Sequence, residues 1–411
     1  MENKIENPSS EEVLKLASEV GSLLLQNGAE ISRVEETMER IAAHYGVSGE
    51  NFFVLSNGIF TTGHSFANAE FIPIKGSRLD IVAEVNQFSR DIIQFDIPLE
   101  QAKERLAKIK NLPLKPAWEQ YLGAGFGCAG FCALFGGGLL DCAASFVTAI
   151  ILNWFMSRVG SPYLSKTLAN IFGGFIGTLL CILFYHFGFG ESLGNMIVGT
   201  LILLIPGVAF TNGLRDVANE DYLAGITRLM DALMMFLSIA IGVCFGFIFH
   251  SWFVGGVIHL SGAQISPETA SLFAQMLAAF IGTSFFAILF GLPRRFYVPA
   301  GIVGMIGWIT FLGLSRYTSA GVFASTFIAS TVVAFISRFA AIKLKCPSTL
   351  FLICGEFPMI PGGGVFWTAY YIASEQFPMA LNSGLQAIKI TIAIVLGIII
   401  AANLISRRKA A

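Results

Sequence analysis

Three carboxylates and one arginine lie in or beside long apolar stretches of this 411-residue chain. Asp231 and Glu356 fall within such stretches, and Arg215-Asp216 follow another. Because a charge in an apolar medium is costly, it usually has a partner or a task. We therefore consider Glu356, Asp231 and Asp216 candidates for binding protons, and Arg215 a candidate contact for an anion. A local ion pair between Arg215 and Asp216, and a purely structural role for Asp231, remain alternatives.

Proline and glycine interrupt two of the apolar stretches at corresponding places. The first interruption is Pro206-Gly207, and the second is Pro361-Gly362-Gly363, three residues after Pro358. Proline removes a helical N–H group and glycine accepts unusual backbone angles, so each helix should break there. Paired breaks at equivalent places predict a binding site that both halves of the chain share. An ordinary kink that eases helix packing is the alternative.

Uncharged polar residues narrow the candidate site. Asn212 follows the first break, and Gln386 lies 155 residues after Asp231. The same separation relates Leu204-Ile205-Pro206-Gly207 to Met359-Ile360-Pro361-Gly362. This spacing predicts an internal repeat, with Asp231 and Gln386 at equivalent positions. The other polar residues in or beside apolar stretches include Asn153, Asn170, Gln275 and Lys389.

The elements that would position these residues are long apolar segments. Charged residues make up 13% of the chain and apolar residues 55%, whereas soluble proteins contain roughly 25% charged residues. From Trp118 onward, apolar stretches of about 20 residues recur, long enough to cross a bilayer. We expect about ten membrane-spanning helices, near residues 118–138, 140–158, 167–187, 191–211, 229–250, 271–292, 297–314, 320–342, 348–370 and 384–405. The net charge of −1 argues against a nucleic-acid partner.

Positive charges are distributed unevenly between the two sides of these spans. If the N-terminal region is cytoplasmic, the loops between spans on the cytoplasmic side and the C-terminal tail hold most of the Lys and Arg residues of the membrane part. The opposite side holds only Arg316, with Lys389 just inside the last span. This asymmetry is what the positive-inside rule requires. It predicts a multi-pass protein of the cell (inner) membrane with both termini in the cytoplasm.

When the chain is aligned with itself at a shift of 155 residues, without gaps, the first five expected spans nearly coincide with the last five. Because five is an odd number, the second half must enter the membrane from the opposite side. We therefore expect an all-α polytopic fold of two inverted five-helix repeats, an architecture common among secondary transporters. The expected parts are a small cytoplasmic α+β domain with its linker (1–117), a first membrane half (118–250) and a second membrane half (251–411).

The N-terminal region is rich in acidic groups and is predicted to be soluble. Apolar residues recur at helical spacing over 11–27 and 30–45, before β-type runs at 51–55, 58–62 and 69–72 and helices near 79–94 and 98–109. No metalloprotease motif, nucleophile triad or phosphate loop accompanies its titratable residues, so we interpret them as structural or solvated groups. The residues considered are Glu30, Glu35, Glu36, His44 and His64.

We expect neither a metal nor another cofactor. Cys128 and Cys132 lie one helical turn apart without further Cys or His residues nearby, so they are interpreted as small packing residues. His186, His250 and His259 lie at or outside the expected exterior ends of spans and do not form a cluster. No residue is assigned a catalytic role.

Two stretches of the chain resemble the signatures of one family. Asn27-Gly28-Ala29-Glu30-Ile31-Ser32-Arg33-Val34-Glu35-Glu36-Thr37-Met38 resembles the opening signature of the threonine/serine exporter family. Pro206-Gly207 with Asn212-Gly213 and Arg215-Asp216, followed by Asp221-Tyr222-Leu223-Ala224-Gly225, resembles that family's motif in the fourth span. The resemblance covers nearly the whole chain. Two halves that are separate polypeptides in some relatives are fused here.

The resemblance implies export of a small hydrophilic metabolite, driven by an ion gradient. Threonine and serine are the founding substrates of the family, and two-chain relatives are linked to succinate and similar dicarboxylates. We therefore expect a proton-coupled exporter of a small amino acid or carboxylate, whose partners are its substrate and the lipid bilayer. A membrane receptor with the soluble region as its output is the alternative from another class. An enzyme is disfavoured, and a homo-oligomer is left open.

Overall fold

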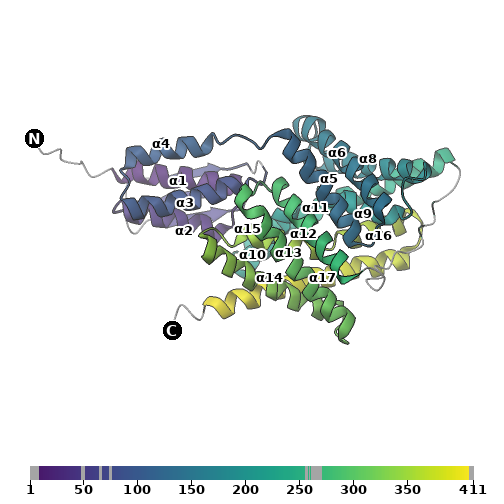
Figure 1. Ribbon diagram of the computed structural model, residues 1–411. Coiled ribbons are helices and arrows are strands. Elements are labelled where there is room, and N and C mark those ends of the chain that lie inside the picture. The colour runs from purple at the N-terminus through teal and green to yellow at the C-terminus, as the bar shows by residue number, and fades with distance from the viewer. Residues whose placement is uncertain are drawn as a thin grey trace, which may run out of the picture.

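The structure of the protein, a computed structural model, describes residues 9–47, 51–63, 67–73, 76–254, 258, 260 and 271–406. Figure 1 shows an N-terminal group of helices and strands beside a larger bundle of helices. His64 and His259, which the sequence analysis considered, lie outside the described residues.

The N-terminal region combines four helices with a small antiparallel sheet. Ser9 caps the first helix, because its hydroxyl accepts a hydrogen bond from the backbone N–H of Glu12 at 3.2 Å. The strands lie in the order β1-β2-β3, with Phe53 opposite Phe60. The predicted mixture of helices and strands is confirmed. The elements are α1 (Ser10–Gln26), α2 (Ile31–His44), β1 (Asn51–Leu55), β2 (Gly58–Thr62), β3 (Ala67–Phe71), α3 (Leu79–Phe95) and α4 (Leu99–Lys110).

The remainder of the described chain is helical. The helices are α5 (Ala117–Leu134), α6 (Leu139–Phe155), α7 (Ser161–Tyr163), α8 (Lys166–His186), α9 (Leu193–Leu201), α10 (Gly207–Ala218), α11 (Tyr222–Val254), α12 (Leu272–Leu289), α13 (Tyr297–Tyr317), α14 (Val322–Leu344), α15 (Thr349–Glu356), α16 (Gly362–Ala373) and α17 (Phe377–Ser406). A π-helical turn, Met156–Gly160, joins α6 to α7.

Within the described residues, eight helical segments are long and apolar enough to cross a membrane. A ninth is obtained if α9 and α10, which are bent by 66° at their junction, form one span. The ten expected spans are therefore not confirmed. The difference is α5, which begins with polar residues and carries four glycines, so its mean hydropathy is low. This helix packs between α6, α9 and α12.

Element boundaries recur at the separation that the sequence predicted. Helices α5 and α12 are both 18 residues long, and Leu272 follows Ala117 by 155 residues. Helices α10 and α16 are both 12 residues long and begin at Gly207 and Gly362, again 155 residues apart. The turns after them contain Glu220 and Glu375, with positive φ angles of 70° and 58°. The two halves thus repeat their local backbone geometry.

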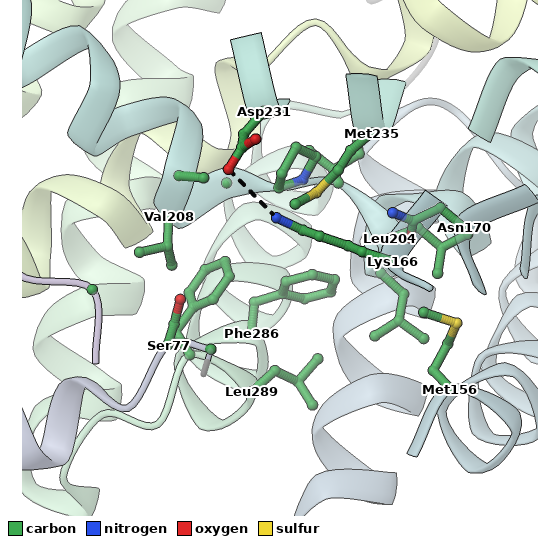
Figure 2. Close-up of a pocket in the computed structure, with 18 of the residues that line it drawn as sticks. Ser77, Met156, Lys166, Asn170, Leu204, Val208, Asp231, Met235, Phe286 and Leu289 are labelled. Atoms are coloured by element: carbon green, nitrogen blue, oxygen red, sulfur yellow. Dashed lines mark ion pairs between the residues drawn. The ribbon is translucent and has the colours of Figure 1, made fainter. Parts of the chain in front are cut away.

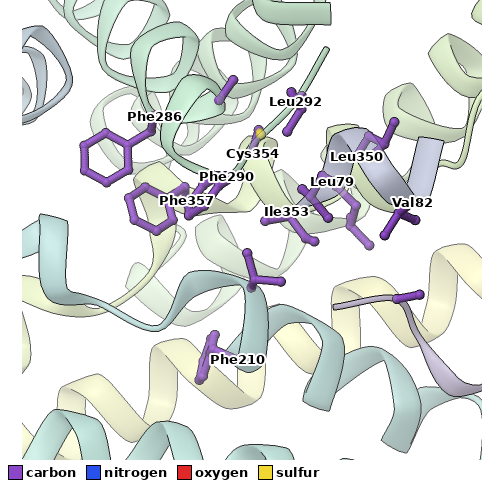
Figure 3. Packing of buried hydrophobic residues seen from close by; sticks show 14 of the residues in the cluster. Leu79, Val82, Phe210, Phe286, Phe290, Leu292, Leu350, Ile353, Cys354 and Phe357 are labelled. Carbon is purple, nitrogen blue, oxygen red and sulfur yellow. The ribbon is translucent and has the colours of Figure 1, made fainter. Parts of the chain in front are cut away.

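A continuous apolar core joins the N-terminal region to the helical bundle. Figure 3 shows Leu79 and Val82 of α3 close to Leu350 and Ile353 of α15. The backbone N–H of Leu79 also donates to the carbonyl of Phe290, just after α12, at 3.2 Å. The N-terminal region is therefore docked on the bundle through apolar packing and backbone hydrogen bonds.

Candidate functional site

The first break separates α9 from α10. A single 3-10 turn, Ile202–Leu204, follows α9, and Ile205 is extended with ψ of 128°. Pro206 has φ of −77° and ψ of 58°, and α10 begins at Gly207. Because proline has no N–H group, the helical hydrogen-bond ladder cannot continue through it. The N–H of Gly207 instead donates to the carbonyl of Ile205 at 2.8 Å.

The second break repeats these local dihedral angles, although Thr349–Ala373 counts as one span, whereas the helices at the first break are bent by 66°. A 3-10 turn, Phe357–Met359, is followed by Ile360 with ψ of 132°. Pro361 has φ of −76° and ψ of 47° before α16 begins at Gly362. The N–H of Gly362 donates to the carbonyl of Ile360 at 2.7 Å. The prediction of helix breaks at equivalent places in the two halves is confirmed.

The two breaks touch each other. A Cβ atom at Gly207 would collide with the ring of Phe357, and one at Gly362 would collide with the side chain of Ile205. The Phe357 ring also packs against the Phe286 ring at a tilt of 34°, with ring centroids 4.7 Å apart. The two breaks are therefore in contact, and this contact depends on the missing side chains of two glycines.

A cavity of about 540 Å³ lies beside the first break. Of the candidate site residues that the sequence indicated, Gly28, Pro206, Gly207, Asn212 and Asp231 line it, as do Asn153 and Asn170 from the wider set of polar residues. Neither Glu356 nor the second break does so. The other polar lining residues are Ser77, Gln120, Lys166 and Arg228. Figure 2 shows the cavity with Asp231 and Lys166 joined as an ion pair.

Lys166 is one of the polar cavity residues that sequence reasoning did not propose for the site, because a lysine near the end of a span was interpreted only as a topology signal. Its Nζ lies 3.9 Å from Oδ2 of Asp231, and both side chains are more than half exposed. Asn170 is buried, and Nδ2 of Asn153 is a buried donor without a partner among the described residues. Lys166 is the first residue of α8 and directly follows the N-cap Ser165. The N-cap serine in the sequence could therefore have indicated that Lys166 lies at the start of a helix.

Glu30 of the N-terminal signature binds the arginine of the fourth-span motif. Its Oε2 lies 2.5 Å from Nε of Arg215, and its Oε1 lies 3.0 Å from Nε of Arg33. Burial alone would raise the pKa of Glu30, but the charges of Arg215 and Arg33 outweigh it and hold the pKa below its ordinary value. Arg215 also donates to Oγ1 of Thr349 at 2.6 Å. Arg215 is thus paired with Glu30 rather than with its neighbour Asp216.

Asp216 is fully buried and holds the chain that leads into α2. Its Oδ2 lies 2.6 Å from Arg228, and its Oδ1 accepts from the backbone N–H of Ile31 at 3.2 Å. Arg228 also donates to the carbonyl of Ala29 at 2.9 Å. Asn212 donates to the carbonyl of Gly28 at 2.6 Å. The two signature stretches therefore bind each other, and they join the N-terminal region to α10.

The remaining candidates lie apart from the cavity. Oε1 of Glu35 accepts from the backbone N–H of Val54 at 3.1 Å, which ties α2 to β1. Glu356 is fully buried, accepts from Oγ of Ser330 at 2.7 Å, and has one oxygen without a partner among the described residues. Gln386 is exposed on α17, and a Cβ atom added at Gly363 would lie 3.8 Å from the side chain of Val198.

The described residues contain no group of three or more His, Cys, Asp or Glu side chains that could hold a metal ion. Long apolar helices, paired broken helices in contact and a cavity with several polar residues beside one break are typical of a multi-pass membrane protein of the transporter class.

The particular family is shown by comparison with known proteins. Residues 15–250 match the family described as "Putative threonine/serine exporter", and residues 275–404 match the family described as "Threonine/Serine exporter, ThrE". The chain belongs to the threonine/serine exporter family.

Three relatives illustrate the range of this similarity. The chain is 21% identical to a "Probable threonine/serine exporter" of Mycobacterium tuberculosis over 97% of its own length and 78% of the relative. It is 23% identical to a threonine/serine exporter of Corynebacterium glutamicum, over 94% and 81%. It is 24% identical to a "Probable succinate transporter subunit" of Klebsiella aerogenes, over 56% and 91%. No solved structure matches the chain.

Proposed function

We propose that the protein is a secondary active transporter of the cell (inner) membrane that exports a small amino acid of the threonine/serine type. The observation that carries this proposal is the cavity beside the first break, whose largely apolar lining includes a few polar residues, and which Pro206, Gly207, Asn212 and Asp231 help to line. Its volume of about 540 Å³ lies in the range of small-molecule sites. Membership of an exporter family supports the direction of transport.

The N-terminal turn of α10 is the proposed contact for the substrate carboxylate. Gly207, Val208 and Ala209 open this helix and line the cavity. The N–H groups of a first helical turn lack intrahelical partners, and the helix dipole favours an anion there. The equivalent turn of α16, which contains Gly362 and Gly363, touches α9 and the first break and is the proposed contribution of the second half.

Glu356 is the proposed carrier of the coupling proton. It is fully buried, and Ser330 is its one hydrogen-bonding side chain among the described residues. A buried carboxylate without a cationic partner is stable in its protonated form and must be hydrated or paired to ionise. Asp216 is a weaker candidate, because Arg228 already compensates its charge. Asp231 is assigned to the substrate rather than to the proton.

The Glu356→Gln variant tests this assignment. Glutamine keeps the size of the side chain but cannot exchange a proton, so accumulation of threonine driven by a pH gradient should be lost while the protein stays folded. The exposed Glu375 provides the matched control, and Glu375→Gln should transport like the wild type. Gradient-driven accumulation at the wild-type level in reconstituted Glu356→Gln protein would remove the assignment.

For the topology we propose ten spans in two inverted sets of five helices, with α5 as the first span. The recurrence of element boundaries after 155 residues supports the repeat, and the distribution of Lys and Arg supports cytoplasmic termini. The proposed parts are a cytoplasmic domain with its linker (1–117) and two membrane halves (118–250 and 251–411). Reporter fusions that are active only in the cytoplasm, placed after Lys110 and at the C-terminus, should both be active.

Flux in reconstituted vesicles separates the candidate functions. Labelled threonine and serine should accumulate only when a pH gradient is imposed, and a protonophore should abolish the accumulation. Accumulation of succinate in their place would favour a dicarboxylate exporter, which the similarity to a succinate transporter subunit supports. Specific binding of a ligand without any flux would favour the receptor.

A further inference from the structure

The cavity beside the first break contains a cation and an anion that face each other. Lys166 is the first residue of α8, and Asp231 lies in the third turn of α11. Their charged atoms are 3.9 Å apart, and Figure 2 shows the lysine side chain extended across the cavity toward the carboxylate. The exposed fractions of the two side chains, 59% and 53%, leave both charges open to a ligand.

The other ion pair at this cavity is already engaged. Arg228 lines the cavity, but its guanidinium binds Asp216 at 2.6 Å and the carbonyl of Ala29 at 2.9 Å. Both side chains are buried, and breaking a buried pair is costly. A half-exposed pair at 3.9 Å contributes little to stability and separates easily. Lys166 and Asp231 are therefore the charges that a substrate can recruit.

We propose that Lys166 and Asp231 are the specificity-determining pair of the transporter, reading both charged ends of an α-amino acid. This inference rests on the proposed export of an amino acid and names the groups that select it. Asp231 binds the α-ammonium group, and Lys166, together with the N-terminal turn of α10, binds the α-carboxylate. The zwitterion replaces one weak ion pair by two charge-assisted contacts.

The polar residues next to this pair suit a substrate with a hydroxyl group. Nδ2 of Asn153 is a buried donor without a partner among the described residues, and Asn170 is a second buried amide in the same lining. An unsatisfied buried donor gains a hydrogen bond when a hydroxyl oxygen reaches it. Leu204 and Phe286 form apolar parts of the lining, so a short side chain fits this surface best.

The same charges act against a dicarboxylate. The second carboxylate of such a ligand would meet Asp231, and like charges at short distance repel. The second half of the chain does not repeat the pair, since Gly321 and Gln386 stand 155 residues after Lys166 and Asp231. Selection of the zwitterion is therefore a property of the first half.

Three ligands test the pair, because each charge can be removed from the ligand as well as from the protein. They are threonine, 3-hydroxybutyrate, which lacks the ammonium group, and 1-amino-2-propanol, which lacks the carboxylate. Ligand-induced increases in the melting temperature of the full-length protein in detergent measure the binding of each compound. Threonine flux is measured separately in vesicles. The variants are Asp231→Asn and Lys166→Gln, with Lys389→Gln, exposed on α17, as the control.

Each variant should lose affinity for threonine by about tenfold to a hundredfold, the change expected for a lost hydrogen bond to a charged group. Asp231→Asn should bind 3-hydroxybutyrate as well as the wild type does, and Lys166→Gln should bind 1-amino-2-propanol as well as the wild type does. Lys389→Gln should match the wild type for all three compounds. Unchanged threonine affinity in both cavity variants, or an equal loss for all three compounds, would overturn the proposal.

The two proposals fail in different ways. If the wild type binds threonine with this selectivity but moves none, the exporter is refuted and the charge pair stands. If the wild type transports threonine and both cavity variants do so with unchanged affinity, the pair is refuted and the exporter stands. A wild-type protein that binds no threonine overturns both.

Discussion

Two glutamates of the N-terminal signature have opposite electrostatic surroundings. Glu30 is buried against Arg33 and Arg215, whose charges hold its pKa below the ordinary value of 4.5. Glu35 is half-buried and accepts one backbone hydrogen bond, and burial raises its pKa. A lowered pKa means that the ionised form of Glu30 stabilises the fold, whereas ionisation of Glu35 costs stability.

Glu30→Gln should therefore destabilise the protein, because it leaves Arg215 buried without its carboxylate. The expected cost is roughly 3–5 kcal/mol, the range for breaking a buried ion pair. The stability that Glu30 contributes is present at neutral pH and is lost only as the pH falls below 4.5 through its lowered pKa. Melting temperatures of the purified protein between neutral and acid pH measure both effects.

Glu35→Gln is the matched control for this experiment. The glutamine oxygen can still accept from the N–H of Val54, and the cost of ionising the carboxylate disappears. The melting temperature at neutral pH should be unchanged or higher. An equal loss of stability in both variants would show that the charges of Arg33 and Arg215 are not what distinguishes Glu30.

The partners of these residues show what single-sequence reasoning can reach. The sequence identified Glu30 and Arg215 as parts of two signatures, but 185 residues separate them and no local pattern predicts their contact. It also predicted that Asp231 and Gln386, which are 155 residues apart, occupy equivalent positions in the two halves. Of the two, only Asp231 lines the cavity. Lys166 was overlooked, because a lysine at the end of a span is expected from topology alone.

Helix breaks were predictable at the scale of elements because their cause is local. Pro206 and Pro361 each remove a backbone donor, and the same dihedral angles follow in both places. The weak hydropathy of α5 is equally local, and it leaves the ten expected spans unconfirmed. The glycines of this helix allow close packing, and Gly130 brings α5 against Gly282 of α12.

Gly207→Ala and Gly362→Ala should each push the two breaks apart. The new Cβ atoms would overlap the ring of Phe357 and the side chain of Ile205, respectively. Overpacking of this kind typically costs about 1–3 kcal/mol. Lower melting temperatures and slower threonine flux in vesicles are expected for both variants.

Gly313→Ala on α13 controls for a change of glycine to alanine within a helix. No heavy atom lies within 4 Å of its added Cβ, so the variant should be neutral or slightly stabilising. Wild-type stability and flux in Gly207→Ala and Gly362→Ala would contradict the view that the breaks must touch.

The cavity belongs to the whole molecule rather than to one part of it. Leu25, Gly28 and Ser77 come from the N-terminal region, whereas Lys166 and Phe286 come from the two membrane halves. The N-terminal region is fixed there by Arg228 and Asn212, which bind the backbone carbonyls of Ala29 and Gly28. Transport through this cavity therefore requires the docked region to move or to leave a path beside it.

The contact between the membrane halves predicts that the chain can be divided. Helices α5 and α12 pack together, as do α11 and α16, and the broken helices interlock at Gly207 and Phe357. One relative, which aligns over 91% of its own length with 56% of this chain, is named a transporter subunit. Residues 1–264 and 265–411, expressed as two polypeptides, should co-purify and restore threonine flux.

Either polypeptide expressed alone should be degraded or aggregate. It would expose the apolar surfaces that the other half covers, such as the contact of Phe131 in α5 with Phe286 and Phe357. A cut after Gly188 is the control for dividing the chain. It separates α8 from α9 within the first half and leaves the surface between the two halves intact. If residues 1–264 alone fold to a monodisperse protein and transport threonine at the wild-type rate, the second half is not part of the pathway and the site shared by both breaks is wrong.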